Sequence, residues 1–306
     1  MIEVLFSSST LASALRLATP LMLAAIGGAF TYHANVFNIA LEGFMLISAF
    51  FSVWGTITFG SPWIGLLIGA ASAMLASLLF GFLVLKLKAD NIVVGLALNL
   101  GSLGLTTWLL EAIFGVRGVV MVESGGFPTI DLPLISKIPY LGNVISGQNL
   151  LVYLTLAVAI FGEYFIYRNI FGIRLRAVGE YPQAAESVGI SVNGYRLYSI
   201  LLSGLFAGFA GAFLTLSGAS MFSENMTAGK GFIALAAVFF SQGRPSLIIL
   251  ASILFGYTEA TSVALQQFGV PPQLMLTIPY LITVIALTLI SAFPRRAKNA
   301  HGTASA

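Results

Sequence analysis

Long apolar runs constrain this chain more than any other feature of its sequence. A hydrocarbon core about 30 Å thick needs about 20 helical residues to cross it. By that measure the apolar runs are residues 11–30, 37–59, 62–87, 92–114, 149–167, 197–217, 231–240, 245–261 and 274–293. Charged residues make up only 8% of the chain, against about 25% in an average soluble domain. We therefore exclude a soluble enzyme, a disordered chain and a coiled coil, and expect an all-α, polytopic helical membrane protein.

The basic residues predict the orientation, because Lys and Arg are enriched in short cytoplasmic loops. The cations that follow the third, fifth, short and last runs are Lys86, Lys88, Arg168, Arg174, Arg176, Arg196, Arg244, Arg295, Arg296 and Lys298. We assign these to the cytoplasm, and Arg117, Lys137 and Lys230 to the outside. The assignments agree if the N-terminus is outside and residues 231–240, with their flanks, make a crossing. We expect about nine transmembrane helices, with eight and ten as alternatives. They form a single domain over residues 1–293, followed by a polar cytoplasmic tail over 294–306.

A weak internal repeat supports this layout. Residues 27–30 (Gly-Gly-Ala-Phe) resemble residues 210–213 (Ala-Gly-Ala-Phe), and residues 39–41 resemble residues 233–235, both Ile-Ala-Leu. On nine crossings the copies are five apart, and an odd offset inverts the second copy. Inverted-topology repeats are typical of transporters. The alternative is a chance match of small and aromatic residues in an apolar chain.

The densest polar stretch lies in the predicted cytoplasmic segment over residues 168–193. Pro182 suits a first helical turn, and Gly189 suits the position after a helix end. Small residues at 184 and 185 let a partner approach, and nearby charges can anchor the helix: Arg174, Arg176, Glu180 and Glu186. The pattern predicts a short helix that docks on another protein; the alternative is an ordinary charged loop.

Three motifs carry a resemblance to a known family. The first resembles Arg-Ala-Val-Gly-Glu-Asn-Pro-x-Ala-Ala followed by Gly-Ile, and is matched by Arg176, Ala177, Val178, Gly179, Glu180, Pro182, Ala184, Ala185, Gly189 and Ile190, with Tyr181 in place of Asn. The second, over residues 36–46, resembles Asn-Ile-Gly-x-Glu-Gly with Ala40 in place of Gly. The third, over residues 202–212, is similar to Ser-Gly-x-x-Ala-Gly-x-x-Gly. In this order they resemble ABC-importer permeases of the simple-sugar and nucleoside type, which are relatives of the branched-chain amino acid permeases. The form of the second motif favours the nucleoside branch.

The resemblance implies a membrane-spanning permease subunit of a bacterial cytoplasmic (inner) membrane importer for nucleosides, with simple sugars such as ribose as the alternative cargo. It implies three protein partners: an ABC ATPase, a second related permease in a heterodimer, and an extracytoplasmic substrate-binding protein. We expect contact with membrane lipid and none with nucleic acid. The sequence has no Gly-x-x-x-x-Gly-Lys-Ser/Thr phosphate loop. We therefore expect no cofactor and no enzyme activity in this chain, with ATP and Mg²⁺ bound by the ATPase. The implied coupling residues are Arg174, Arg176, Gly179, Glu180, Pro182, Ala184, Ala185 and Gly189.

Asn38, Glu42 and Asn99 are candidates for the translocation path. Asn38 and Glu42 are four residues apart, so within a helix they would share one face. A carboxylate within a crossing marks a function by default; the alternative is that Glu42 accepts hydrogen bonds from backbone at a broken helix near Gly43. Asn99 belongs to a polar or small stripe at helical spacing, namely Asn91, Gly95, Asn99, Ser102 and Thr106. The alternative for this stripe is contact between helices.

Other residues narrow the function further. The chain has no cysteine and two histidines, so we expect no metal site. An ion-coupled secondary transporter would need a network of ionisable groups in the membrane, and an intramembrane enzyme would need convergent acids and bases; the sequence favours neither. Gly204, Gly208 and Gly211 predict close helix packing. We expect residues 115–148 to form an extracytoplasmic loop that either receives the binding protein or caps the pore.

Overall fold

The computed structural model describes residues 7–122, 125–131, 140–217, 220–266 and 281. Within this part of the chain, seven helices are long and apolar enough to cross a membrane: α2 (Ser8–His33), α3 (Leu41–Phe59), α4 (Pro62–Gly81) continued by the π-helical η1 (Phe82–Lys86), α5 (Asn91–Phe114), α7 (Leu150–Tyr167), α10 (Val192–Leu216) and α12 (Pro245–Gln266). A shorter apolar helix, α11 (Lys230–Ser241), lies between α10 and α12. The all-α, polytopic prediction is confirmed. The predicted crossing over residues 274–293 and the tail over 294–306 lie outside the described residues, apart from residue 281.

Polar residues at the helix starts explain where these helices begin. The side chains of Ser7, Asp90, Asn149 and Ser191 each accept a hydrogen bond from a backbone N–H two or three residues ahead. They satisfy amides that have no partner within the helix. Gly60 and Gly115 end α3 and α5 in the left-handed conformation, with φ of 66° and 65°, which glycine adopts without steric penalty.

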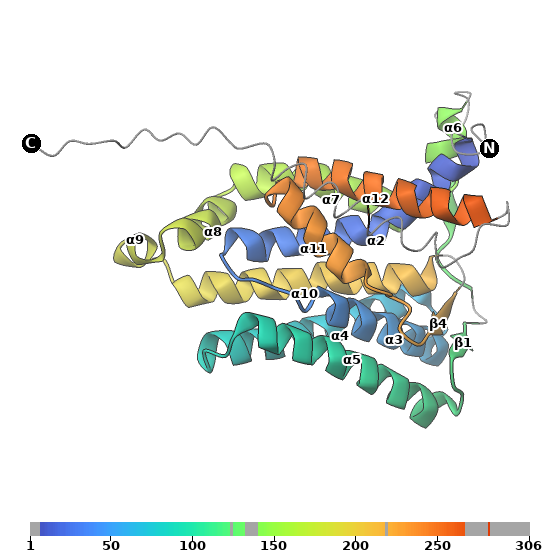
Figure 1. The fold of residues 1–306 in the computed structure, drawn as a ribbon, viewed down its shortest axis with the longest axis horizontal. Helices are drawn as coiled ribbons and strands as arrows, with labels where there is room; N and C mark the ends of the chain where they lie inside the picture. The colour runs from blue at the N-terminus through green and yellow to red at the C-terminus, as the bar shows by residue number, and fades with distance from the viewer. Residues whose placement is uncertain (1–6, 123–124, 132–139, 218–219, 267–280, 282–306) are drawn as a thin grey trace, which may run out of the picture.

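The two ends of the bundle differ in structure and charge. The short helices α8 (Ile170–Glu180) and α9 (Pro182–Ser187) lie at one end. At the other end are α6 (Leu141–Ile145) and the paired strands β1 (Val119–Met121) and β4 (Met221–Ser223) (Figure 1). The α8–α9 end carries the predicted cytoplasmic cations of the loops. The chain enters α2 at the opposite end, as the predicted orientation requires.

The predicted outer loop is tied to the second half of the chain. Strand β1 pairs with β4 in antiparallel register, with Val120 opposite Phe222. A second small sheet joins β2 (Thr129–Ile130) to β3 (Gln148–Asn149). Arg117 bonds Glu111 at 2.6 Å, and this hydrogen bond raises the pKa of the Arg117 guanidinium above its ordinary value. The loop therefore folds back over the ends of α3 and α10.

Helices α3 and α11 both begin at mid-depth in the bundle. The start of α3 lies level with Ser203 in α10 and with Asn99 in α5, neither of which is near an end of its helix. From there α3 runs toward the end that carries β1 and β4, whereas α11 runs toward the end that carries α8 and α9 (Figure 1). Residues 224–229 run from β4 to the start of α11 and cover the depth that α11 does not, which is the arrangement that the predicted crossing requires.

This arrangement is an inverted repeat. In each copy a long helix, α2 or α10, is followed by a non-helical return and then by a helix that starts inside the bundle. The matched tetrapeptides at 27–30 and 210–213 lie near the ends of α2 and α10. The matched tripeptides at 39–41 and 233–235 lie near the starts of α3 and α11. The sequence repeat therefore marks corresponding points of two oppositely directed units.

Helix α10 packs at the centre of the bundle against α2, α3 and α4. Its glycines allow this approach. A Cβ at Gly204 would collide with the Ser77 side chain, and one at Gly208 would meet Ala70 at 2.8 Å. A Cβ at Gly211 would collide with the carbonyl of Met45 in α3. The predicted close packing of these three glycines is confirmed.

Candidate functional site

The predicted docking segment forms two helices, α8 and α9, at one end of the bundle. Asn169 caps α8 by accepting a hydrogen bond from the Phe171 N–H at 2.9 Å. Pro182 occupies the first turn of α9, and Gly189 follows that helix with φ of 81°. The Ile190 N–H returns to the Ala185 carbonyl at 3.0 Å. The helix start and stop that the sequence indicates are therefore both present.

Helix α8 is fixed to the body of the protein by close contacts. A Cβ at Gly179 would collide with the backbone carbonyl of His33, the last residue of α2. The Arg176 guanidinium lies over the Tyr167 ring, 4.7 Å from its centre. Arg174 reaches the Tyr195 hydroxyl at 3.4 Å. Helix α8 is therefore in direct contact with the end of α2, the end of α7 and the beginning of α10.

Helix α9 presents small and apolar groups to its surroundings. Ala185 is buried, whereas Ala184 is exposed. Tyr181 and Val188, at the two ends of α9, are 72% and 73% exposed. Glu180 is also exposed and lies beside a cavity at this end of the bundle. Exposed apolar side chains on a short polar helix suit a docking surface.

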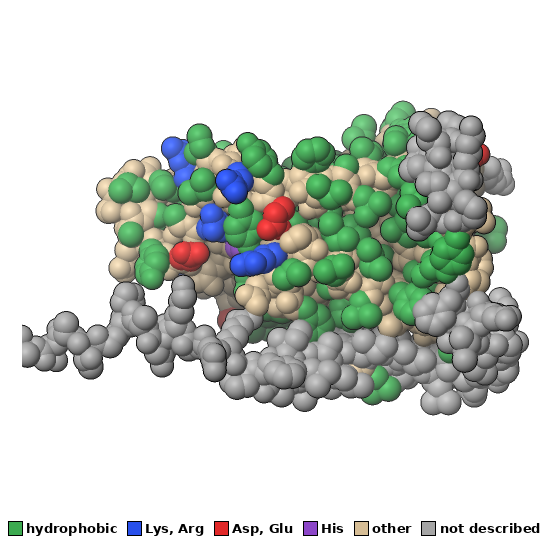
Figure 2. All heavy atoms as spheres, turned by 90° about the horizontal axis from the view of Figure 1, so that it is seen from above, with side chains coloured by type: hydrophobic (Ala, Val, Ile, Leu, Met, Phe, Trp, Pro, Cys, Tyr) green, Lys and Arg blue, Asp and Glu red, His purple; other side chains and the backbone are tan. Residues whose placement is uncertain are grey.

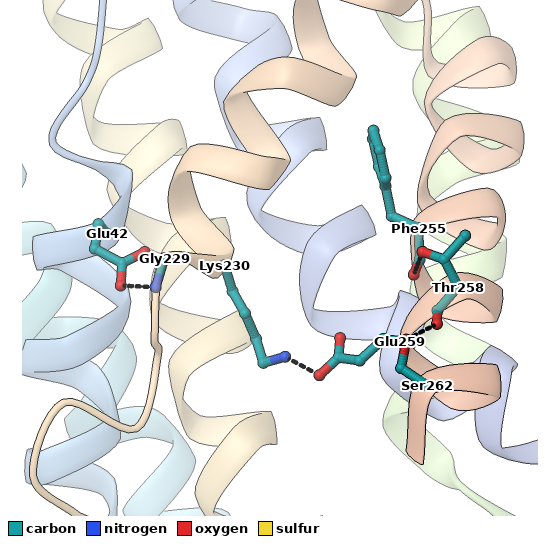
Figure 3. A network of polar contacts seen from close by, with 7 residues as sticks. All are labelled: Glu42, Gly229, Lys230, Phe255, Thr258, Glu259 and Ser262. Atoms are coloured by element: carbon teal, nitrogen blue, oxygen red, sulfur yellow. Dashed lines mark hydrogen bonds and ion pairs between the residues drawn. The ribbon is translucent and has the colours of Figure 1, made fainter. Parts of the chain in front are cut away.

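Glu42 holds the start of α11. One carboxylate oxygen accepts a hydrogen bond from the backbone N–H of Gly229 at 2.8 Å (Figure 3). The other accepts from the backbone N–H of Gly231 at 2.6 Å. Glu42 is 8% exposed and lies in the first turn of α3. The first amides of a helix carry partial positive charge, so this carboxylate lies where two helix N-termini favour an anion. The observed contact is the backbone bonding that the sequence left as an alternative.

Asn38 and Asn99 make hydrogen bonds around the start of α3, which lies next to the start of α11. Asn38 accepts a hydrogen bond from the Ala40 N–H and donates to the Ser203 hydroxyl, both at 3.0 Å. Asn99 accepts from the Gly43 N–H at 2.8 Å and donates to the Ile39 carbonyl at 3.0 Å. These side chains satisfy backbone groups around the start of α3.

The expectation that Asn38 and Glu42 share a helix face is wrong. Helix α3 begins at Leu41, because the Asn38 side chain takes the Ala40 N–H and the chain before it is not helical. The predicted stripe on α5 does form one face, and it lies against α3. A Cβ at Gly95 would meet Ile39 at 3.2 Å, and Ser102 lies next to Gly43.

The sequence did not reveal the ion pair between Lys230 and Glu259. Lys230 is the first residue of α11, and Glu259 lies in the outer half of α12 (Figure 3). Lys230 is thus at mid-depth rather than in an outer loop. The side chains are only 15% and 25% exposed. Glu259 is an ionisable group within the apolar run over residues 245–261, which is the available signal, but no spacing rule joins it to Lys230, 29 positions away.

Charged groups gather at the end of the bundle that carries α8 and α9 (Figure 2). Figure 2 shows the basic side chains of one face concentrated toward the end that carries α8 and α9, with a histidine among them. Among the residues that the structure describes, no group of three or more His, Asp or Glu side chains could hold a metal ion. The described polar groups can dock a partner and hold helix ends.

Comparison with known proteins identifies the family of this chain and several relatives. Residues 10–287 match the family described as the permease component of the branched-chain amino acid transport system. The chain is 38% identical to the nucleoside ABC transporter permease protein NupC of Lactococcus lactis, over 89% of this chain and 88% of the relative. It is 35% identical to the guanosine ABC transporter permease protein NupQ of Bacillus subtilis, with the same coverage.

Other relatives extend the range. The protein of Haloferax volcanii named "Putative glucose ABC transporter permease protein TsgC13" is 31% identical over 92% of both chains. Bacillus subtilis and Lactococcus lactis each have a second permease protein that matches this chain. These are NupP of Bacillus subtilis, at 26% identity, and NupB of Lactococcus lactis, at 21%. A solved inward-facing ABC transporter of the metal-chelate type has a TM-score of 0.50 at 14% identity, covering 93% of this chain and 86% of that one. That similarity concerns the fold alone.

Proposed function

Because this chain belongs to the permease family of the branched-chain amino acid transport system, we propose that it is the membrane-spanning subunit of an ABC importer for nucleosides. The observation that supports nucleosides as the cargo is the 38% identity with a nucleoside permease over 89% of the chain. The chain is a permease subunit of a bacterial membrane transporter, and its relatives are subunits of the same kind. ATP and Mg²⁺ belong to a separate ATPase.

The ATPase docks on α8 and α9. Support comes from the exposed surface around Tyr181, Ala184 and Val188, and from the close fit of Gly179 on α2. Movement of the ATPase shifts α8, which carries the motion to the transmembrane helices. Ala184→Arg and Glu180→Arg are expected to abolish uptake while membrane insertion, followed by immunoblotting of membranes, is kept. Wild-type uptake by either variant would contradict the docking assignment.

A second, related permease completes the path. Two bacteria each have two permease proteins that match this chain, which supports a heterodimer. A substrate-binding protein delivers cargo at the outer end, where strands β1 to β4 order the loop. Co-purification tests both parts: tagged chain should retain the ATPase and a second permease of different sequence.

The mid-depth junction of α3 and α11 borders the path. Asn38, Glu42 and Asn99 contribute to the path by holding these two helix starts in place. Their polar atoms form hydrogen bonds with backbone groups or with Ser203. A helix start inside a membrane protein exposes amides only where it lines a cavity or has partners. These residues supply those partners.

The experiment that tests the cargo is uptake of radiolabelled guanosine, uridine and ribose by cells with and without this chain. ATP depletion is the control for the energy source. We expect ATP-dependent nucleoside uptake to disappear with the chain. Loss of ribose uptake alone would move the cargo to simple sugars, the second candidate, which the 31% identity to a glucose permease supports. Unchanged uptake of all three would refute both cargoes.

A further inference from the structure

A cavity of about 600 Å³ lies at the cytoplasmic end of this chain. Its walls are the end of α2, the return segment over residues 34–38, α8, and the end of α11 with the turn that follows it. Small-molecule sites span about 300–1,000 Å³, so the volume suits a ligand of nucleoside size. Glu42 and Lys230, whose contacts are described above, do not line this cavity.

Aromatic rings follow one another along the cavity wall. The Phe37 and Phe239 rings are 5.6 Å apart, and Tyr32 lies 5.9 Å from Phe239. The series continues through His33 to Tyr167, each 5.6–5.7 Å from the preceding ring. Phe37 and Phe239 remain 37% and 40% exposed. Their uncovered faces can stack on a planar ring, since every nucleobase has a π-face.

Polar groups share the same cavity. Asn35 and Gln242 are exposed carboxamides, each able to donate and accept hydrogen bonds. Both have positive φ, 54° and 53°, because they lie just after the ends of α2 and α11, where a left-handed residue commonly terminates a helix. The Nε of Arg176 is buried and has no hydrogen-bond partner in the part of the chain that the structure describes. Donors, acceptors and ring faces thus converge on one space.

We propose that this cavity is a nucleobase-binding site that holds a nucleoside on the cytoplasmic side of the permease. The base stacks on Phe37 and Phe239, and its edge bonds the carboxamides of Asn35 and Gln242. The inference rests on the proposed function, because that function supplies nucleosides as cargo. The site deepens it by giving the cargo a contact after it has crossed the membrane. A nucleotide carries the same base, so the test must separate nucleoside from nucleotide.

The test uses the full purified complex with its ATPase and second permease, but without ATP and without the binding protein. Radiolabelled guanosine binding is measured at equilibrium for the wild type, Phe239→Ala and Gln242→Ala. The matched control is Phe161→Ala, an exposed aromatic residue of α7 away from the cavity. Because stacking on one ring is a large share of base affinity, Phe239→Ala should weaken binding by about tenfold. Phe161→Ala should bind as the wild type does.

A photoreactive azidoguanosine maps the site without any substitution. Label on peptides that contain residues 32–37 or 239–244 is expected, and label only on other peptides would overturn the site. Wild-type affinity in both cavity variants would also overturn it. Tighter binding of guanosine 5′-monophosphate than of guanosine would overturn the nucleoside as occupant.

The two proposals fail in different ways. A complex that takes up guanosine but binds none in the cavity would refute the site and leave the transport function standing. Cavity labelling by a complex that transports no nucleoside would refute the cargo and leave the site standing.

Discussion

Removing the charge of Glu42 should release the start of α11. In Glu42→Gln the side chain keeps its shape, but its carboxamide can accept from only one of the two amides that bond it at 2.8 Å and 2.6 Å. A hydrogen bond to a charged group contributes about 1.5–3 kcal/mol, and the favourable charge at a helix N-terminus about 0.3–1 kcal/mol. We expect the variant to lose about 2–3 kcal/mol of local stability, which corresponds to about 30- to 150-fold faster opening of this helix start.

Hydrogen exchange followed by mass spectrometry reads this change directly. Peptides that cover residues 226–236 should exchange about 30- to 150-fold faster in Glu42→Gln, whereas peptides of α7 should not change. Glu111→Gln is the matched control, because that carboxylate pairs with exposed Arg117 at the outer end. Exchange within about threefold of the wild type would mean that other contacts hold α11 and that the reasoning is wrong.

Two further predictions concern helix contacts. Gly179→Ala should abolish transport at normal expression, because the new Cβ collides with the His33 carbonyl; Gly101→Ala, which has open space, should transport normally in the same uptake assay. Lys230→Met should destabilise the protein by about 1–3 kcal/mol, because it leaves Glu259 largely buried without its partner. The double variant Lys230→Met/Glu259→Met should recover part of that loss, and a thermal-shift measurement in which it is no more stable than the single variant would contradict the pairing.

The sequence predicted most of the described fold because membrane crossings follow from local composition. Each predicted run over residues 11–261 coincides with a helix of similar bounds. Residues 231–240 were identified as a half-length crossing, and α11 has that length. Pro182 and Gly189 predicted both ends of α9, since helix start and stop signals act within a few residues. Local chemistry is therefore sufficient to place these elements.

The contacts of the polar residues were less predictable. The apolar run from residue 37 does not indicate that α3 starts four residues later, where the Asn38 side chain accepts from the Ala40 N–H. The other bond of that side chain, to Ser203 165 positions away, depends on how the helices pack. Glu42 was correctly singled out as a costly carboxylate. Its partners at 229 and 231 were not accessible, because hydrogen bonds between distant segments depend on how the helices pack.

The sequence by itself determined that this chain is a multi-pass membrane protein, and it predicted a cytoplasmic docking segment, because hydropathy, basic residues and helix punctuation are properties of adjacent residues. Only the tertiary structure decided that two helix starts meet at mid-depth, with Glu42 holding α11 and Asn99 holding α3. It also joined residues 32–37 to 239–244 around one aromatic cavity. The physical reason is that burial forces every amide and charge to find a partner, and the partner available is set by packing rather than by position in the chain.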